Sequence, residues 1–248
     1  MLYEWMTGIP MADKMVTLMI HFGALLAVLS SCKNRLKRLN QEGRHERRSR
    51  RRRDRHIDQV ALLDIKVLRT ATIPVLLGLL LYVRGDKWVT NVAALSLTLF
   101  LNGLLLFLPS RIPQGNKDCR NMSGLDSLVT GLGGVLAMIP GFSRLGSIAT
   151  AGMLRGVGRE TAVDTALMLS IPALFGIVLI DIYAVAVSKL AMGLWGMLVY
   201  ILMAAVSFVS SYLGIMIIRF ASSKADLNSF GYYSLGMALF SFILYLTI

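Results

Sequence analysis

Charge, cysteine and aromatic residues are all scarce in this sequence. Of its 248 residues, 16% are charged and 8% are aromatic, and cysteine occurs only at Cys32 and Cys119. A soluble domain of this size needs more charge to cover its surface, so most soluble enzyme folds are excluded. Two cysteines do not make a disulfide framework, and we expect both at cytoplasmic helix ends, where reducing conditions keep thiols apart.

Apolar residues make up 55% of the chain, and the mean hydropathy is +0.63. A bilayer solvates apolar side chains and requires only that backbone polar groups are satisfied internally. We therefore expect an all-α polytopic membrane protein in which residues 1–248 form one integral membrane domain. Six stretches approach or exceed the roughly 20 residues that cross ~30 Å of hydrocarbon. They are residues 15–32, 67–83, 89–109, 161–187, 190–218 and 230–248.

Most of the net charge of +12 comes from one segment. Residues 33–55 hold twelve basic and three acidic residues, which leaves the rest of the chain nearly neutral. We expect residues 33–57 to form a disordered cytoplasmic loop that touches anionic lipid headgroups. Basic residues also follow alternate later spans, as the positive-inside rule requires. No Phe, Tyr or Trp interleaves with the arginines of this segment, so we expect no nucleic-acid binding.

Residues 123–157 do not fit a simple count of spans. Their first part is apolar and rich in glycine but too short to span comfortably, and Pro140 with Gly141 breaks it. A second short apolar helix then leads back to a basic stretch at Arg155, so both ends face the cytoplasm. The pattern predicts a re-entrant helix-loop-helix that dips into the membrane, with residues 140–146 at its tip.

The side chains and backbone of this tip suit a phosphate group. Gly141 and Gly146 let the backbone approach a ligand closely, and the N-terminus of the following helix presents unpaired N–H groups. Arg144 adds a planar cation that matches phosphate bidentately. Ser143 and Ser147 add hydroxyls, and Ser143 becomes a nucleophile if a base lies nearby. The expected catalytic residues are Arg144 and Ser143, and the expected substrate-binding residues are Gly141, Phe142, Gly146 and Ser147.

A structural interpretation of the tip stays open beside the functional one. In that interpretation Arg144 caps a helix or pairs with an acid such as Asp126 or Asp164. The glycines then only allow close packing of helices. An arginine at membrane depth costs a few kcal/mol, which favours the functional interpretation without identifying a substrate.

Three further polar residues lie within or at the end of apolar stretches. His21 either packs against a neighbouring helix through a hydrogen bond or belongs to the site, and we favour the packing role. Asp181 and Tyr183 lie near the outer end of a span and are candidates for lining a substrate entrance. For Tyr183, anchoring at the membrane interface is the favoured interpretation.

Four sequence segments together resemble one known family. Residues 140–146 read Pro-Gly-Phe-Ser-Arg-Leu-Gly, residues 152–159 Gly-Met-Leu-Arg-Gly-Val-Gly-Arg, and residues 166–172 Ala-Leu-Met-Leu-Ser-Ile-Pro. Residues 21–28 read His-Phe-Gly-Ala-Leu-Leu-Ala-Val. These segments closely resemble the undecaprenyl-diphosphate phosphatase family, the bacitracin-resistance membrane phosphatases. The resemblance runs in register from near Met15 to the C-terminus.

The resemblance implies six transmembrane helices and two re-entrant hairpins in inverted repeats, in the bacterial cytoplasmic membrane. It implies hydrolysis of the C55 isoprenyl diphosphate to the monophosphate carrier used in peptidoglycan synthesis, and hence bacitracin resistance. Arg144 is then the main phosphate ligand and Ser143 a hydrogen-bonding or nucleophilic partner. The resemblance also implies a divalent cation, magnesium or calcium. A homodimer is a further open expectation.

The sequence departs from the family pattern in two places. The family's paired-glutamate motif and the Gly-His stretch that follows it find no counterpart, and we expect the first hairpin to be absent. Glu42 and Glu46 have the spacing of the paired-glutamate motif. They lie among arginines, however, so we do not identify them with that motif. In the second motif, polar positions common in the family are occupied by Leu145, Ile148 and the shorter Asp164. No metal ligands are therefore identifiable.

Two explanations of these departures stay open. Either the true start of the protein lies upstream of Met1, which we favour, or the chain is a degenerate homologue. Both leave the activity of this polypeptide an open question. They also leave an alternative function, a non-catalytic lipid-phosphate binder or flippase of the same fold.

Overall fold

The computed structural model describes residues 14–52, 59–85, 92–119, 121–188, 194–223 and 228–247. Every helix or strand in these ranges is an α-helix, so the expected all-α fold class is confirmed. In chain order the helices are α2 (Lys14–Arg52), α3 (Gln59–Gly85), α4 (Val92–Arg111), α5 (Gly124–Leu136), α6 (Arg144–Leu154), α7 (Arg159–Ser188), α8 (Leu194–Ser223) and α9 (Asn228–Thr247).

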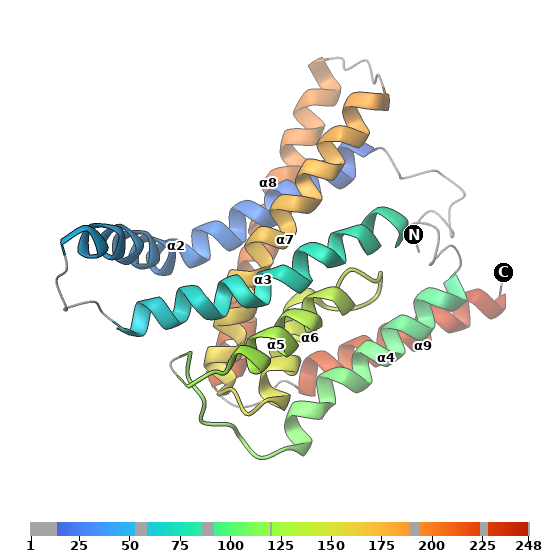
Figure 1. Ribbon diagram of the computed structural model, residues 1–248. Helices are drawn as coiled ribbons and strands as arrows, with labels where there is room; N and C mark the ends of the chain where they lie inside the picture. Colours follow the sequence, from blue (N-terminus) through green and yellow to red (C-terminus); the bar gives the residue numbers. More distant parts are fainter. Residues whose placement is uncertain are drawn as a thin grey trace.

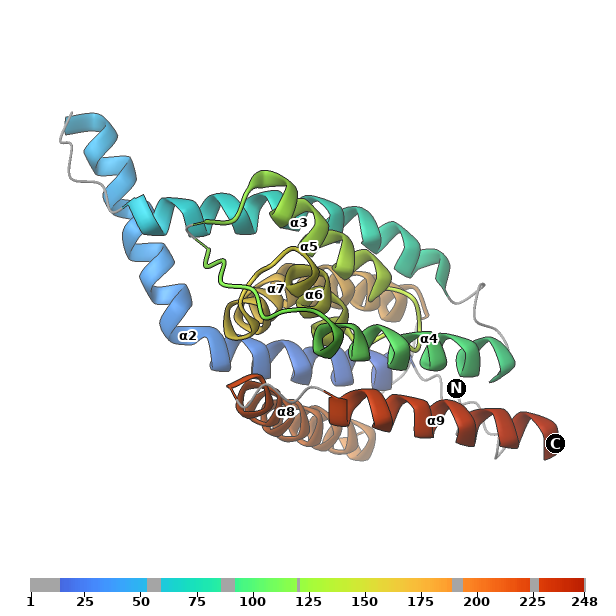
Figure 2. The ribbon, with the colours of Figure 1, turned by 90° about the horizontal axis from the view of Figure 1, so that it is seen from below.

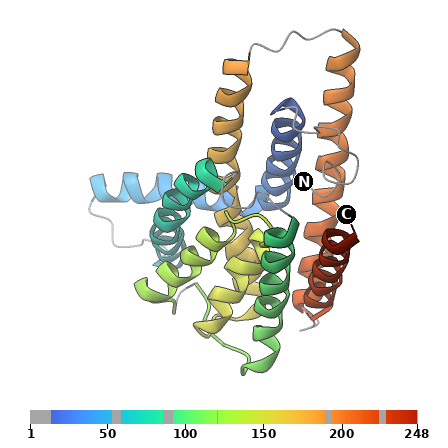
Figure 3. The same ribbon diagram turned by 90° about the vertical axis from the view of Figure 1, so that its right-hand side faces the viewer.

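The short helices α5 and α6 lie with α7 in the middle of the bundle (Figure 2). α6 packs against α5, α7 and α4, while α3 covers α5 and α7. α2 packs against both α7 and α8 (Figure 3), and α4 lies beside α9 (Figure 1). The core therefore follows α7, whose fully buried apolar side chains include Ala162, Ala166, Leu167, Leu169, Ala173 and Ile177.

Five helices within the described residues are long and apolar enough to cross a bilayer. They are Lys14–Gln41, Val92–Arg111, Arg159–Val187, Met197–Ser222 and Asn228–Thr247. Their outer faces carry many exposed large apolar side chains, among them Leu202, Ile217, Phe220 and Leu246. Water solvates such a surface poorly, whereas lipid tails solvate it well. The polytopic membrane character expected from composition is confirmed.

The stretch at residues 67–83, expected as a sixth span, is not among these five. It forms the second half of α3, where only fourteen positions, 70–83, separate Arg69 from Arg84. Fourteen helical residues rise about 21 Å, which is less than the ~30 Å of a hydrocarbon core. Part of α3 lies outside the residues whose side chains are described, so the sixth span expected at residues 67–83 stays a prediction.

The basic segment is helical as far as it is described. α2 continues without a break through residues 33–52, so the expected disordered loop is wrong for those residues, while residues 53–57 lie outside the described ranges. Arg, Lys, Leu, Gln and Glu are good helix formers, and extending an existing helix avoids the unfavourable nucleation step. Figure 2 shows the basic half of α2, in lighter blue, turning away from the bundle.

α5 and α6 form a helix-loop-helix whose two ends meet at a common base. Ser123 caps α5 by accepting a hydrogen bond from the Asp126 N–H at 3.1 Å, and the Asp126 carboxylate accepts one from the Ser123 N–H at 3.0 Å. Lys117 Nζ and Arg155 Nε also donate to this carboxylate, at 2.9 and 2.8 Å. The fold-back predicted for residues 123–157 is thus present, and its insertion into a membrane stays a prediction.

Electrostatics strengthen this base. Burial of Asp126, which is 1% exposed, opposes its ionisation, but the hydrogen bonds from Lys117, Ser123 and Arg155 outweigh that effect. They hold the pKa of the Asp126 carboxyl well below its usual range. Hydrogen bonds and ion pairs at Asp126 therefore join the start of α5 to the end of α6.

A second ion-pair cluster joins three spans. Asp164 of α7 lies 3.7 Å from Arg35 Nη1 of α2 and 3.3 Å from Arg219 Nη2 of α8. All three side chains are partly exposed, so each pair contributes little by itself. Together they fix the relative register of α2, α7 and α8 at one end of the bundle.

Candidate functional site

The turn between α5 and α6 has a backbone shape that glycine permits. Gly141 adopts a φ of +99°, which lies in the left-handed region. A Cβ atom at this position would collide with Thr98 of α4. Gly141 therefore serves the turn and its close contact with α4, and that contact holds the tip against the neighbouring helix.

Ser143 is the N-cap of α6. Its Oγ accepts a hydrogen bond from the Gly146 N–H at 3.2 Å, which satisfies one of the free donors at the start of the helix. The hydroxyl hydrogen of Ser143 is not used by this contact. The N-cap role alone explains a serine here, and the remaining hydrogen is available to an acceptor in front of the helix.

Asn102 of α4 ties the tip to two other helices. Its Oδ1 accepts a hydrogen bond from the Ser143 N–H at 2.9 Å, and its Nδ2 donates to Ser234 Oγ of α9 at 2.9 Å. Ser234 in turn donates to the Leu99 carbonyl of α4 at 2.8 Å. Asn102 is 4% exposed, so this buried chain of hydrogen bonds fixes the position of Ser143.

Arg144 begins α6 and carries a buried donor without a partner. Its Nε is enclosed and makes no hydrogen bond within the described structure. The pairing with Asp126 or Asp164, one form of the structural interpretation, is not present in the described structure, where other basic residues engage both carboxylates. A buried donor left unpaired costs about 1–3 kcal/mol, more when it is charged. This geometry favours an anion as the missing partner.

Ser147 adds a second unsatisfied group in the first turns of α6. Its side chain is 1% exposed, and its Oγ has no hydrogen-bond partner among the described residues. The positive end of the α6 dipole lies at the same place. Arg144, Ser147 and the free N–H groups of α6 together give the tip the chemistry of an anion site.

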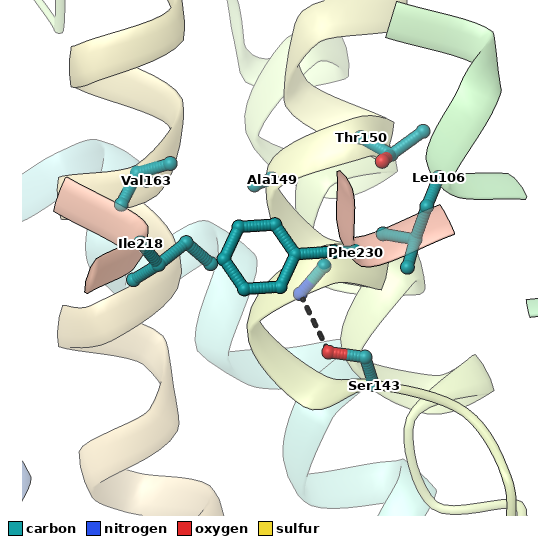
Figure 4. A pocket seen from close by; sticks show the side chains of 8 residues that line it. Leu106, Ser143, Ala149, Thr150, Val163, Ile218 and Phe230 are labelled. Carbon is teal, nitrogen blue, oxygen red and sulfur yellow. Dashed lines mark hydrogen bonds between the residues drawn. The ribbon is translucent and has the colours of Figure 1, made fainter. Parts of the chain in front are cut away.

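An apolar pocket opens beside the tip. It encloses about 370 Å³ of empty space, including its open mouth, and α4, α6, α7, α8 and α9 supply its walls. Figure 4 shows the Phe230 ring between Ile218 and Leu106, with the Ser143 hydroxyl facing the same space. An apolar chain attached to an anion at the tip would find a lipid-like surface here.

A second polar cluster lies between α2, α3 and α7. His21 Nδ1 lies 2.7 Å from Asp181 Oδ2, and the Tyr82 hydroxyl donates to Asp181 Oδ1 at 3.3 Å. Tyr82 also packs against a buried cluster that includes Met138, just before the tip. The helix-to-helix hydrogen bond expected for His21 is present, whereas Tyr183, 72% exposed, faces outward and takes no part in the cluster.

The residues near the tip do not fit a metal ion held by the protein. Magnesium and calcium prefer carboxylate and carbonyl oxygens. Within the described residues no three His, Cys, Asp or Glu side chains come together, and Asp181 is already engaged by His21 and Tyr82. We therefore assign no step of a reaction to a metal.

A family model described as bacitracin resistance protein BacA matches residues 1–240. The chain belongs to this family. Because the match covers nearly the whole sequence, it includes the tip, both polar clusters, four of the candidate spans and the first part of the fifth. The family resemblance drawn from the sequence is thus confirmed.

Several curated relatives are similar to this BacA family member. An undecaprenyl-diphosphatase of Thermosipho melanesiensis is 28% identical over 183 residues, which cover 73% of this chain and 69% of the relative. Undecaprenyl-diphosphatase 1 of Shouchella clausii is 33% identical over 150 residues, covering 60% and 54%. An undecaprenyl-diphosphatase of Halothermothrix orenii is 29% identical over 144 residues, covering 58% and 55%. The chain matches about half the length of the last two.

The BacA tip gathers the residues expected from the sequence, and the structure adds two more. The six expected residues all lie between Gly141 and Ser147. Asn102 is an amide within an apolar stretch of the sequence, and neither it nor Tyr82 belongs to a motif. Both come from helices far from the motif in sequence, so the motif alone did not reveal them.

Proposed function

We propose that this chain is an undecaprenyl-diphosphatase, which hydrolyses the C55 isoprenyl diphosphate to the monophosphate carrier for peptidoglycan synthesis. The observation that carries the proposal is the buried, unpartnered Nε of Arg144 at the start of α6. The names of the relatives supply the substrate class. The apolar pocket beside Ser143 suits the isoprenyl chain of such a substrate.

Each residue of the tip has a part in this proposal. Arg144 binds the diphosphate and stabilises the charge that develops on the transferred phosphoryl group. The Ser143 hydroxyl and the N–H groups of α6 donate to phosphate oxygens, and Ser147 supplies a further donor. Because Ser143 Oγ already accepts a hydrogen bond from Gly146, we favour a binding role for Ser143 over a nucleophilic one.

The setting of the reaction is part of the same proposal. We infer a bacterial cytoplasmic membrane, with the hairpin tip reached from the outer face and the basic end of α2 against anionic headgroups on the inner face. A requirement for magnesium or calcium and a homodimer belong to the proposal as well.

Substitution of Arg144 tests the proposal directly. The purified chain is expected to release orthophosphate from C15 and C55 isoprenyl diphosphates, assayed in EDTA and then with magnesium or calcium added. Arg144→Ala is expected to bind the diphosphate at least about tenfold more weakly and to lower turnover about 10²–10³-fold. Arg111→Ala, an exposed basic residue at the end of α4, is the matched control and is expected to behave like the wild type.

The outcomes separate the two candidate functions. If Arg144→Ala binds the diphosphate as tightly as the wild type, the tip is not the substrate-binding site. Binding of the diphosphate by the wild type without any phosphate release, in the presence of either cation, would replace the hydrolase by the lipid-phosphate binder or flippase.

A further inference from the structure

The apolar pocket beside the tip runs along one face of α6. Gly146, Ala149 and Thr150 line it from that helix. Their spacing of three and four residues places them on a single helix face, in line with the N-cap Ser143, which also lines the pocket. From Ser143 to Thr150 the helix rises about 10 Å. The pocket therefore begins at the proposed anion site and continues along α6 between apolar walls.

The opposite wall of the pocket comes from helices that pack with different partners. Ile218 lies near the end of α8, and Phe230 lies in the first turn of α9. α9 packs along α4, whereas α8 packs against α2 and α7. In Figure 4 the Phe230 ring lies between Ile218 and Leu106 of α4, and so it spans the space between these two groups of helices. Phe230 has the largest side chain in the lining and is only partly buried, so it has the strongest influence on the size of the pocket.

The pocket is too small for a whole C55 chain. Its empty space of about 370 Å³, including the mouth, lies at the lower end of the roughly 300–1,000 Å³ of sites for drug-sized ligands. A C55 chain is larger than such a ligand. Beyond the pocket, the outer face of α8 carries exposed apolar side chains such as Ile217 and Phe220, which suit lipid. The pocket thus has room only for the part of the chain next to the diphosphate.

Shape decides what the pocket accepts. Lipid tails already solvate an isoprenyl chain, so its transfer into the pocket gains mainly packing contacts. The walls that make these contacts are fixed: Ala149 and Val163 are each 1% exposed. Gly146 lets α6 lie close to α4, because a Cβ atom at this position would collide with Leu106. A change of volume in such a wall is therefore felt by the bound chain.

We propose that this pocket is the subsite for the isoprene units next to the diphosphate, and that Phe230 is the specificity-determining residue that bounds it. The inference rests on the substrate class of the proposed function. With the diphosphate at Arg144 and the first turn of α6, the chain leaves the tip past Ser143 and packs between α6 and the Phe230 ring. The remaining units continue into the lipid.

Phe230→Trp tests the subsite by equilibrium binding in detergent. The two probes are a C15 isoprenyl diphosphate and inorganic pyrophosphate, which offers the same anion without a chain. The larger indole fills part of the pocket, so we expect binding of the C15 diphosphate to weaken about tenfold or more. Binding of pyrophosphate is expected to change less than about threefold, because the anion site is left intact. Phe240→Trp is the matched control, since Phe240 lies on the same helix, is 49% exposed and does not line the pocket. It is expected to leave both affinities unchanged.

Ala149→Val provides a second measurement if Phe230→Trp does not fold. It narrows the same space from the side of α6 by two methyl groups. We expect it to weaken binding of the C15 diphosphate at least about fivefold and to leave binding of pyrophosphate unchanged.

The possible results distinguish the subsite from the proposed function. Weaker binding of the C15 diphosphate alone supports the subsite. Unchanged binding in both variants overturns it and leaves the pocket to a membrane lipid. An equal loss for the C15 diphosphate and pyrophosphate also overturns it, because the variants then disturb the anion site. Phosphate release is assayed in parallel. A wild type that binds the C15 diphosphate in this pocket without releasing phosphate overturns the hydrolase and leaves the subsite standing.

Discussion

At the scale of single residues, Asn102 shows how a buried amide positions a functional turn. It lies inside the apolar helix α4, yet both ends of its amide find partners, Ser143 on one side and Ser234 on the other. Because lipid and apolar side chains offer no alternative partners, these contacts persist. Asn102 thereby holds Ser143, the N-cap of α6, in place beside Arg144.

Replacing Asn102 by Leu is expected to destabilise the protein. Leu has a similar size but leaves the Ser143 N–H without its acceptor, which costs about 1–3 kcal/mol. Thermal unfolding in detergent measures the effect as a lower Tm. Ser110→Ala is the control on the same helix, since its exposed hydroxyl donates only to the Phe107 carbonyl, and it is expected to change stability by less than about 0.5 kcal/mol. Equal Tm values for the two variants would contradict this role of Asn102.

At the scale of elements, the α5–α6 hairpin is closed at its base and open to a ligand at its tip. The Asp126 carboxylate receives hydrogen bonds from Lys117, Ser123 and Arg155, which join the preceding loop, α5 and the end of α6. α5, with 13 residues, rises about 20 Å and so is too short to cross a bilayer. The hairpin therefore turns back with Arg144 Nε buried inside the protein, and we expect this turn to lie within the membrane.

The base is expected to weaken in acid. The pKa of Asp126 is lowered in the folded protein relative to its usual value of 3.8, so the unfolded chain binds a proton first as the pH falls. The stabilisation from Asp126 is complete above about pH 5, begins to decline as the pH approaches 3.8, and is lost as it passes through the lower folded value. Tm in detergent between pH 7 and pH 3 measures this loss.

Two variants test whether Asp126, and not another carboxylate, causes the fall in Tm toward acid pH. Asp126→Asn is expected to lower Tm at pH 7 and to show a shallower fall toward pH 3 than the wild type. Asp118→Asn, an exposed carboxyl in the preceding loop, is expected to match the wild type at both ends of the range. If Asp126→Asn keeps the full acid-dependent fall, Asp126 is not its source.

At the scale of the whole molecule, charge and apolar surface set the orientation. Five candidate spans carry lipid-compatible faces, while basic residues concentrate at the end of α2. From the positive-inside rule we expect that end in the cytoplasm and the end of α7 on the opposite side. With a sixth span at residues 67–83, we expect this orientation to bring the hairpin base to the inner face and its tip toward the outer half of the membrane.

Cysteine labelling of intact cells tests this orientation. In a background in which Cys32 and Cys119 are replaced by Ser, Val187→Cys at the end of α7 is expected to react with a membrane-impermeant maleimide. Gln114→Cys, in the exposed loop near the hairpin base, is expected to react only after permeabilisation. Both positions are exposed, so access to the reagent decides the result. Labelling of Gln114→Cys alone in intact cells would mean the inverted orientation.

The sequence predicted the parts of this protein that depend on composition and on neighbouring residues. Apolar stretches indicated the membrane fold, and the Pro-Gly break with Ser143 and Arg144 indicated the hairpin tip, because these signals are local. Charge counting failed for residues 33–52, where helix propensity prevails.

Long-range packing supplied the rest. His21 and Asp181 are 160 positions apart, and Asn102 is 41 positions from Ser143, so no periodicity or motif spacing relates them. The apolar spans that carry these residues exclude water, and their polar groups are therefore satisfied by whichever helices fold beside them. Tertiary structure thus selected the partners of the tip, while the motif had already determined that Arg144 would be there.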